Sequence, residues 1–279
     1  MVTGASTGIG AATARELARR GFHVLAGVRR EADAAKLRSD RVEPLILDIT
    51  DQAHVDALAG RVASDGRPLR ALVNNAGIAV NAPVETLPMA EWRRQFEVNL
   101  FGHIAATQAV LPRLIDGAGT VVNISSVGGR VAMPTYGAYA GSKFALEAVS
   151  DALRREVAAH GVKVVVVEPG GVATEMSGRG IATANRLAAG MTSAQHARYD
   201  HLVDAVVAQA ESFTAKGLPA TKVAEVIADA ITAKNPRVRY TVGRDAAVFV
   251  RLSRLVPDRL LDRLLRRDLR SHLRSAAPA

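Results

Sequence analysis

The stretch YGAYAGSK, residues 136–143, contains two tyrosines and one lysine at spacings that suit a helix. Tyr139 stands four residues before Lys143 and Tyr136 stands seven before it, so either phenol can lie on the helical face of the amine. A phenol beside an ammonium group can transfer a proton, as the reduction of a carbonyl requires. The stretch by itself does not show which of the two tyrosines would act.

The opening residues, VTGASTGIG at 2–10, could hold a phosphate. Gly4, Gly8 and Gly10 allow a tight turn and a close approach of the backbone. A phosphate can then accept hydrogen bonds from the amides at the start of the following helix. Three glycines alone indicate little, and their spacing, T-G-x-x-x-G-x-G, differs from the common dinucleotide pattern G-x-G-x-x-G.

Short β-branched apolar runs alternate with longer stretches of helical periodicity. The runs predict six strands, at residues 23–27, 43–47, 70–74, 120–125, 162–168 and 238–242. The run VKVVVVEP is unbroken, as in a strand buried on both faces of a parallel sheet. Helical patterns lie between the runs, for example at 11–20, 51–62 and 142–160. This alternation predicts an α/β fold with a doubly wound parallel sheet of the Rossmann type.

We find no repeat, low-complexity tract or linker, so we expect a single domain over residues 1–279. Within it, residues 1–175 would form the cofactor and catalytic core. Residues 176–217 break the alternation and would form a helical substrate lid, although an ordinary surface excursion is the alternative. Residues 237–279 form a basic C-terminal segment with the spacing of amphipathic helices.

The first strand of the sheet looks too short. Only Met1 and Val2 precede the glycine-rich turn, whereas a strand normally has about five residues. Either this strand is stunted or the chain starts upstream of Met1. We expect an upstream start, because a missing length of central strand would leave backbone groups of its neighbours unpaired.

Composition excludes several classes of protein. Of the 279 residues, 48% are hydrophobic, enough for one sizeable core. The absence of cysteine excludes disulfides, thiolate metal sites and cysteine nucleophiles, and we expect no metal. No apolar run is long enough to span a membrane, and no signal peptide is recognisable. We therefore expect a soluble, cytoplasmic protein.

The net charge of +9 is unevenly distributed. Residues 237–279 contain eleven arginines and four aspartates, a surplus of seven positive charges. Their leucines recur at helical spacing, and Pro257 suits the start of a second helix. A cationic amphipathic helix can lie on an anionic membrane, but we favour the alternative that its leucines cover the sheet or the pocket. We expect no nucleic acid partner, because no aromatic residues interleave with these arginines.

Several motifs occur together in a familiar order. They are TGASTGIG at 3–10, NNAG at 74–77, Asn99 in VNLFGH, Ser126 in NISSVGG, Y-x-x-x-K from Tyr139 to Lys143, and PGGVAT at 169–174. On these motifs the chain resembles the short-chain dehydrogenase/reductase family over residues 1–175. The segments ETLPMAEWRRQFEVNLFGH and RYTVG further resemble its hydroxysteroid and retinol dehydrogenase-like branch.

The resemblance distinguishes the two tyrosines. In the family the active tyrosine follows a serine by thirteen residues, and Ser126 precedes Tyr139 by that number. Thirteen residues before Tyr136 stands Asn123. The implied catalytic residues are therefore Asn99, Ser126, Tyr139 and Lys143. Tyr136 would be a wall of the substrate pocket or simply a loop residue.

The chemistry of carbonyl reduction gives each of these side chains a role. A free tyrosine, with a pKa of about 10, is a poor base at neutral pH. We therefore expect Lys143 and the positive charge of an oxidised nicotinamide to lower the pKa of Tyr139. Ser126 would orient the carbonyl oxygen towards Tyr139. The family further implies that Lys143 binds the nicotinamide ribose and that Asn99 holds a water in a proton relay.

The resemblance also implies a nicotinamide cofactor. The residues expected to bind it are Gly4, Ser6, Thr7, Gly8, Ile9, Gly10, Arg29, Asp48, Asn75, Ala76, Gly77, Tyr139, Lys143, Pro169, Gly170, Val172 and Thr174. Val28 stands where an NAD-selective protein has an acid, and Arg29 and Arg30 follow, as suits a 2′-phosphate. We therefore expect NADP(H) rather than NAD(H). Thr7, in place of the basic residue of many NADP-using relatives, argues the other way.

We expect an NADP(H)-dependent oxidoreductase that interconverts an alcohol and its carbonyl. Six apolar residues favour a lipophilic, steroid-, retinoid- or lipid-like substrate: Val80, Val131, Met133, Pro134, Met176 and Ile181. The alternatives are an NAD-dependent alcohol dehydrogenase of the same family and a non-catalytic dinucleotide-sensing protein. The family also implies a homodimer or homotetramer, formed through helices that include residues 144–160.

Overall fold

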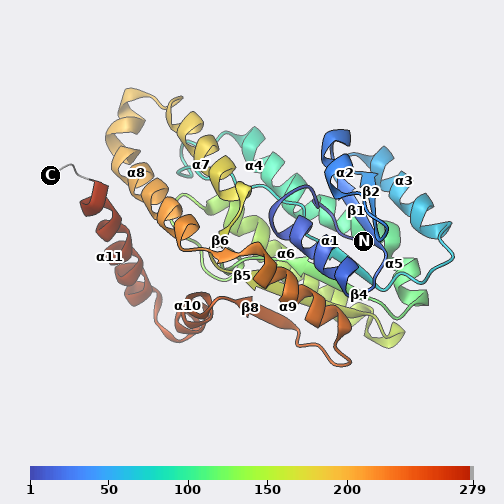
Figure 1. Cartoon of the computed structure of the whole chain (residues 1–279). Coiled ribbons are helices and arrows are strands. Elements are labelled where there is room, and N and C mark those ends of the chain that lie inside the picture. Colours follow the sequence, from blue (N-terminus) through green and yellow to red (C-terminus); the bar gives the residue numbers. More distant parts are fainter. Residues whose placement is uncertain (277–279) are drawn as a thin grey trace.

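The computed structural model describes residues 1–276, except for the side chains of residues 245, 254, 271 and 273–276. At its centre lies a parallel sheet with the strand order β2-β1-β3-β4-β5-β8 (Figure 1), in which Val2 bridges β1 and β3. The strands are β1 (Val24–Val28), β2 (Val42–Ile46), β3 (Ala71–Asn74), β4 (Thr120–Ile124), β5 (Lys163–Pro169) and β8 (Arg239–Val242). Each lies within one residue of its predicted bounds. The doubly wound α/β fold is therefore confirmed.

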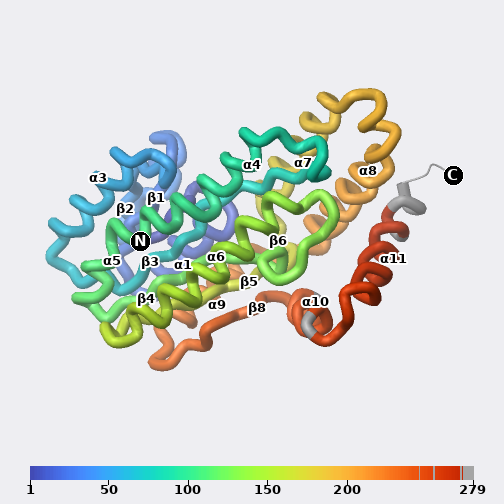
Figure 2. Tube along the Cα trace, turned by 180° about the vertical axis from the view of Figure 1, so that it is seen from behind, coloured from blue at the N-terminus to red at the C-terminus, as the bar shows by residue number. Residues whose placement is uncertain are grey.

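Helices cover both faces of the sheet (Figures 1 and 2). On one face lie α1 (Gly8–Arg19), α2 (Glu31–Leu37) and α9 (Ala220–Thr232). On the other lie α3 (Gln52–Ala63), α5 (Gly102–Asp116) and α6 (Gly137–Glu156). Leu17 and Ile227 fill the first layer, and Leu58 and Leu114 fill the second. Burying apolar surface on both sides explains why the strands read as unbroken apolar runs.

Residues 1–3 take the place of the central strand. The Val2 amide donates to Leu25 O at 2.9 Å, and Val2 O accepts from Gly27 N at 2.8 Å. On the other side, Val73 donates to Met1 O at 2.8 Å. The short segment thus pairs with both neighbouring strands. The backbone groups named here are therefore not left unpaired.

The segment predicted as a lid contains two helices, α7 (Glu175–Ala188) and α8 (Ser193–Ala215). It leaves the body after β6 (Val172–Ala173) and returns at β7 (Leu218–Pro219), and these two short strands pair with each other. Thr192 begins α8 with a capping box to Gln195. The lid helices are therefore tethered at a common point beside the carboxyl ends of the sheet strands.

The C-terminal segment forms α10 (Arg244–Leu255) and α11 (Asp258–Ala276), and α11 runs along α8 (Figures 1 and 2). Leu269 packs on Ala205 and Val206 of α8. The Gln209 amide donates to Asp268 Oδ2 at 2.5 Å. Helix α11 is thus attached to the outer side of the lid.

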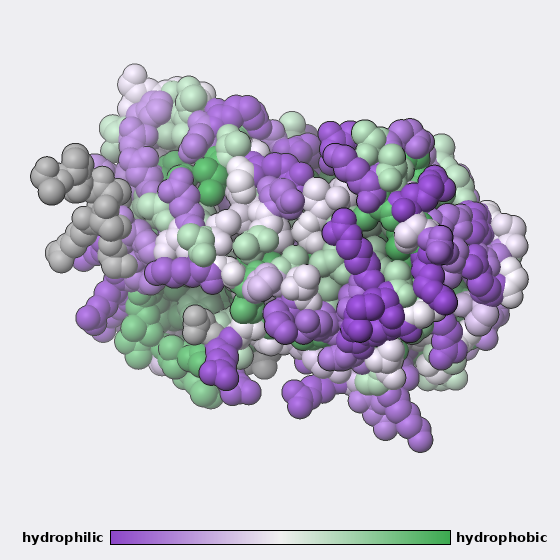
Figure 3. All heavy atoms as spheres, viewed as in Figure 1, coloured by the Kyte–Doolittle hydropathy of each residue, from purple (hydrophilic) through white to green (hydrophobic). Residues whose placement is uncertain are grey.

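The expectation that the leucines of this segment cover the sheet or the pocket is wrong for four of them. These are Leu252, Leu255, Leu260 and Leu264, and Leu255 is 82% exposed. For Leu260 and Leu264 the reason is geometric, because α11 presents only one stripe of side chains to α8. Figure 3 shows apolar side chains gathered on the surface near α10. No helix within residues 1–276 combines the length and the apolar character needed to cross a bilayer.

Candidate active site

The glycine-rich turn and the NNAG segment interlock. The side-chain nitrogen of Asn75, Nδ2, donates to Thr3 O and to Gly4 O, both at 3.0 Å. A Cβ at Gly10 would lie 2.3 Å from Gly4 O, and one at Gly4, where φ is +63°, would lie 2.6 Å from Ala76 Cα. Neither contact is possible for a larger residue. The glycine spacing therefore reflects a tight fit of backbone on backbone.

A polar groove opens in front of this turn. It is lined by residues of the glycine loop, of α1 and of the start of α7, including the predicted cofactor residues Ser6, Thr7, Gly8 and Thr174. Its volume is about 680 Å³, within the range of small-molecule sites. The groove lies at the N-terminus of α1, whose free amides and dipole favour a phosphate. These residues therefore fit the pyrophosphate of a dinucleotide.

The other predicted residues of the cofactor site are spread around this groove. Ile9, in the first turn of α1, packs against the hydrophobic core. A Cβ on Gly77 would lie 3.5 Å from Asn99 Oδ1, so Gly77 lies against the Asn99 amide. Gly170 approaches α10, since a Cβ there would meet Ala246 Cβ at 2.8 Å. Val172 pairs with Leu218 between the two ends of the lid, and Pro169 ends β5. The PGG loop is thus fixed by the lid and the C-terminal segment.

The two arginines after β1 differ in their surroundings. Arg30 donates to both carboxylate oxygens of Asp33, at 2.8 and 3.1 Å. Arg29 is exposed and forms no ion pair within the part of the chain that the structure describes. Asp48, across from it, accepts from the Thr50 amide and hydroxyl at 3.0 and 2.8 Å. Of the two guanidinium groups, Arg29 is the one that remains available to an anion.

Ser126 and Tyr139 meet at Gly128. A Cβ on Gly128 would lie 3.1 Å from Tyr139 Cε1 and 3.5 Å from Ser126 Oγ, so the glycine leaves room for both side chains. The Ser126 hydroxyl oxygen accepts from the Gly128 amide at 3.0 Å and keeps its own hydrogen for donation. The structure therefore brings together the serine and the tyrosine that the thirteen-residue spacing paired.

Tyr136 precedes α6 and stands edge-on to Tyr139, with ring centroids 6.1 Å apart. Its other side packs with Val206 of the lid and Leu269 of α11. The Tyr136 ring therefore contacts the Tyr139 ring as well as residues of α8 and α11.

Burial controls the protonation of the Tyr139 and Lys143 side chains. It raises the pKa of Tyr139, against a smaller lowering by the Ser126 hydroxyl. It lowers the pKa of Lys143 to about 8, and the amine donates to Ile124 O at 2.8 Å. The expected lowering of the Tyr139 pKa by Lys143 is therefore not produced by the protein's own groups, because the cost of burying a phenolate dominates.

Asn99 lies in a short π-helix, residues Glu97–Phe101, between α4 (Met89–Phe96) and α5. Its Oδ1 accepts from Ile78 N at 2.9 Å, and its Nδ2 donates to Ile78 O at 3.0 Å. A second Nδ2 contact reaches Ser142 Oγ at 3.4 Å. The side chain thus clamps the backbone just beyond NNAG.

His103 is a buried residue that the sequence did not single out. Its Nε2 lies 2.6 Å from Ala76 O, so a ring N–H there supports the carbonyl of the NNAG segment. Burial lowers the pKa of His103 to about 3, and the nearby charge of Lys143 contributes. The imidazole is therefore neutral over the working range of pH.

A cluster of buried ion pairs joins the segments that carry the candidate residues Ser126 and Lys143. Arg130 contacts Glu168 at 2.7 Å and Glu147 at 3.1 Å, and Arg239 contacts Glu147 at 3.0 Å. Thr241 donates to Glu168 at 2.7 Å. The cluster connects the Ser126 loop, α6, the end of β5 and β8, so the C-terminal strand takes part in placing the site. The sequence analysis did not find this cluster, because its members come from segments far apart in the chain.

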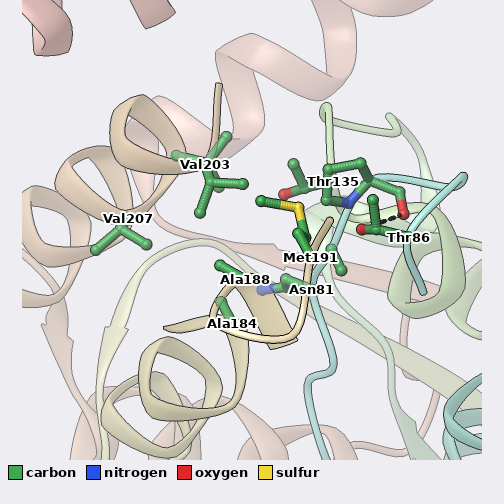
Figure 4. A pocket seen from close by; sticks show the side chains of 11 residues that line it. Asn81, Thr86, Thr135, Ala184, Ala188, Met191, Val203 and Val207 are labelled. Atoms are coloured by element: carbon green, nitrogen blue, oxygen red, sulfur yellow. Dashed lines mark hydrogen bonds between the residues drawn. The ribbon is translucent and has the colours of Figure 1, made fainter. Parts of the chain in front are cut away.

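A small cavity, partly open to solvent, lies between α7 and α8 and the body (Figure 4). None of the six apolar residues predicted to line the pocket lines it. Val80 instead belongs to a small core cluster with Leu87 and Ala138. Met176 lies near Gly77, since a Cβ on that glycine would be 3.4 Å from Met176 Cε. The cavity is formed one layer further out, where α7 and α8 approach the body. No group of three or more metal-ligating side chains lies together within residues 1–276.

Comparisons with known proteins agree with this geometry. The family model described as short chain dehydrogenase matches residues 1–185. The NADPH-dependent 3-dehydrocapnine reductase of Ornithobacterium rhinotracheale is 35% identical over 272 residues, covering 94% of each chain. Retinol dehydrogenase 7 of Mus musculus is 38% identical over 270 residues, covering 94% of this chain and 85% of that protein.

Among solved structures, a short chain dehydrogenase from Burkholderia cenocepacia J2315 in complex with NADP is similar, with a TM-score of 0.72 and 26% identity. The match covers 99% of this chain and 96% of that one. The predicted resemblance to the retinol dehydrogenase-like branch is confirmed by the relatives found. The chain belongs to the short-chain dehydrogenase family of oxidoreductases.

Proposed function

We propose that this protein is an NADP(H)-dependent oxidoreductase that interconverts a lipophilic alcohol and its carbonyl, with Ser126, Tyr139, Lys143 and Asn99 as its catalytic site. The observation that carries the proposal is the meeting of Ser126 and Tyr139 at Gly128, on the side of the sheet where the glycine-rich groove opens. The nicotinamide, when bound, supplies or accepts the hydride.

The proton is handled at the Tyr139 hydroxyl. Since burial raises its pKa, the phenol is protonated at neutral pH and suits donation to a carbonyl oxygen during reduction. The Ser126 hydroxyl would donate to the same carbonyl oxygen, orient it towards Tyr139 and stabilise the charge that develops on it. In the direction of oxidation the same phenol oxygen would receive the proton.

Lys143 and Asn99 would complete a proton relay. Lys143 Nζ donates to Ile124 O and has no other hydrogen-bond partner among the residues that the structure describes, so the ammonium has further donors for a ribose hydroxyl or a water. The Asn99 side chain is engaged with the Ile78 backbone. A water held at Asn99 would therefore bind mainly its backbone carbonyl.

The cofactor preference rests on Arg29. It is exposed at the carboxyl end of β1 and free of the carboxylate that engages Arg30, so it can receive a 2′-phosphate. A relative is an NADPH-dependent reductase, and a similar solved structure holds NADP. Arg29→Ala should lower the preference for NADPH over NADH by about 10- to 100-fold, as expected for a charge-assisted hydrogen bond.

The substrate class rests on the lining of the lid cavity. Its walls are mainly alanine, valine and methionine side chains, with no charged residue among the residues that line it. Burying an unpaired charge there would be costly, so a lipophilic substrate is favoured over a phosphorylated or carboxylated one. The relative named for retinol is consistent with this class.

Two surface features suggest contacts with partners, one with further copies of this chain and one with a membrane. Phe101 and Phe144, on the π-helix and on α6, are 52% and 44% exposed, and their burial between two copies would favour the expected homodimer or homotetramer. The exposed leucines of α10 and α11 lie among arginines and suit peripheral contact with an anionic membrane. Sedimentation velocity tests the first, and sedimentation with anionic and neutral vesicles tests the second.

The decisive experiment follows NADPH absorbance with lipophilic ketones for the unmodified protein, Tyr139→Phe and the matched control Tyr136→Phe. Tyr139→Phe should lower kcat by about 10²- to 10⁴-fold and leave NADPH binding intact, because it removes only the proton donor. Tyr136→Phe should stay within about tenfold of the unmodified protein. Undiminished turnover in Tyr139→Phe would refute the site. Turnover with NADH alone would refute the role of Arg29, and cofactor binding without turnover would favour the sensing protein.

A further inference from the structure

Two polar atoms in the lid cavity have no hydrogen-bond partner among the residues that the structure describes. Asn81 Oδ1 and Thr135 Oγ1 are both buried without a hydrogen bond, and their residues are only 9% and 8% exposed. Both residues line the cavity, whose other walls are largely apolar (Figure 4). A buried polar group that lacks a partner costs free energy, so an unpaired atom facing a cavity points to a ligand.

The two residues face the lid from the body. Ala184 and Ala188 of α7, Val203 of α8 and Met191 between the helices lie opposite them (Figure 4). The Ala82 amide donates to Thr135 O at 3.0 Å, which holds the two body segments side by side. The free volume of the cavity is about 10 Å³, room for about one water molecule or one hydroxyl group.

Thr135 also has an unusual backbone. Its φ is +66°, a region that β-branched residues rarely adopt. Such strain persists where the surrounding structure enforces it, and it is often found at ligand sites. In this protein the strained residue directly precedes Tyr136, whose ring stands next to that of Tyr139. Val206 lines the cavity and packs on Tyr136, so the cavity lies one ring beyond the reaction centre.

The chemistry of the two atoms selects the ligand group. An amide oxygen only accepts a hydrogen bond, whereas a threonine hydroxyl both donates and accepts. A hydroxyl can donate to Asn81 Oδ1 and accept from Thr135 Oγ1 together. A ketone or ether oxygen would satisfy only Thr135, and a charged group would find no counter-ion among the lining residues.

We propose that Asn81 and Thr135 form a subsite for a second hydroxyl group on an otherwise apolar substrate, at the end away from the carbonyl that reacts at Tyr139. This inference rests on the proposed alcohol–carbonyl interconversion and names its substrate class more closely. Because the cavity has room only for a hydroxyl-sized group, α7 and α8 must move apart to admit the carbon chain that carries it.

The test uses methyl ketones of increasing chain length, each with and without a terminal hydroxyl, with NADPH. The ratio of kcat/KM for the two members of a pair is measured in the unmodified protein, Asn81→Leu and Thr135→Val. Thr86→Val is the matched control, because Thr86 lines the same cavity but its hydroxyl already donates to Pro83 O at 3.3 Å.

At the chain length that places the terminal hydroxyl in the cavity, the unmodified protein and Thr86→Val should prefer the hydroxylated ketone by about 10- to 100-fold. In Asn81→Leu and Thr135→Val the ratio should fall towards one. Thr135→Val should melt at or above the temperature of the unmodified protein, since it removes an unpaired hydroxyl. No preference at any chain length, or an equal preference in all variants, would overturn the proposal and leave an ordered water as the occupant.

A binding measurement separates this inference from the proposed function. Long-chain diols and mono-alcohols are titrated into the protein saturated with NADP⁺, and the heat of binding is recorded. Tighter binding of diols that Asn81→Leu and Thr135→Val abolish would support the subsite even if no ketone turned over, in which case only the proposed reaction would fail. Equal binding of the two classes without turnover would overturn both.

Discussion

The core that carries the glycine-rich turn and the proposed catalytic residues is held by different forces from helices α7 and α8, the proposed lid. In the core, backbone is locked to backbone, as where Asn75 and Gly10 meet Gly4. Behind it lies a cluster of buried ion pairs. Helices α7, α8 and α11 combine apolar contacts with exposed ion pairs, such as Arg186 with Glu91 and Arg198 with Glu85, and several leucines of α10 and α11 face solvent.

This difference has a functional reason. Hydride and proton transfer need atoms placed to within fractions of an ångström, which directional hydrogen bonds can secure. The proposed lid, which would open for an apolar substrate, is better served by apolar contacts and exposed ion pairs, because these constrain its position less. The comparison predicts that substitutions of the same kind will lower the free energy of unfolding much more in the core than in the lid and the C-terminal helices.

The largest effect is expected for Arg130→Met. It leaves Glu147 and Glu168, whose side chains are 6% and 2% exposed, with Arg239 as their main counter-charge. Breaking such a buried cluster should lower the free energy of unfolding by about 3–5 kcal/mol, measured by urea denaturation.

The control for this change is Arg94→Met, which removes an exposed ion pair of similar length, 2.7 Å to Glu91. It should cost no more than about 1 kcal/mol. Equal losses in the two variants would mean that the buried cluster adds nothing to the stability of the core.

Gly10→Ala should be next in size. The new methyl group would lie 2.3 Å from Gly4 O and 2.4 Å from the Asn75 amide nitrogen, so the turn must shift. We expect a loss of about 1–3 kcal/mol in stability and weaker NADPH binding by fluorescence titration. Gly60→Ala, in α3 with no atom within 4 Å, should instead stabilise by about 0.5–1 kcal/mol. A harmless Gly10→Ala would refute the close fit.

The buried His103 predicts a pH effect in the core. Its pKa is lowered to about 3 by burial, from an ordinary value of 6.5, so the unfolded chain binds a proton that the folded one does not. The stability that this group contributes is complete above pH 6.5 and is lost as the pH falls towards 3. Between about pH 7.5 and about pH 5, unfolding should become easier by about 2 kcal/mol.

Urea denaturation of His103→Gln at both pH values checks this prediction, since the variant should lose that part of the pH dependence. His201→Gln, an exposed position on α8, should keep it. If His103→Gln retains the full dependence, another group is responsible and the buried imidazole is not what makes the core sensitive to acid.

The smallest effect is expected for Leu255→Ala at the end of α10. The side chain is 82% exposed, so truncation removes little buried surface and should change stability by no more than about 0.5 kcal/mol. Thermal denaturation of the isolated protein measures it. A loss of several degrees would show that this leucine is covered in solution, as it would be in an oligomer.

Much of this protein could be predicted from local patterns. The strands lie within one residue of the apolar runs, because a strand buried on both faces must be apolar throughout. The spacing of Ser126, Tyr139 and Lys143 could be recognised because one helix and one loop carry all three. The glycine spacing indicated the turn, although only the structure shows which atoms a side chain would meet.

Other features depended on tertiary structure alone. Arg29 and Arg30 are equivalent as sequence, and only the position of Asp33 decides which of them is free. Arg130, Glu147, Glu168 and Arg239 come from four separate segments, so no spacing brings them together. The same holds for Asn81 and Thr135, because only the structure shows that their buried oxygens lack hydrogen-bond partners among the described residues. Sequence patterns determine which backbone elements form, but contacts between distant side chains depend on how those elements pack, and burial then decides their charge and their hydrogen bonds.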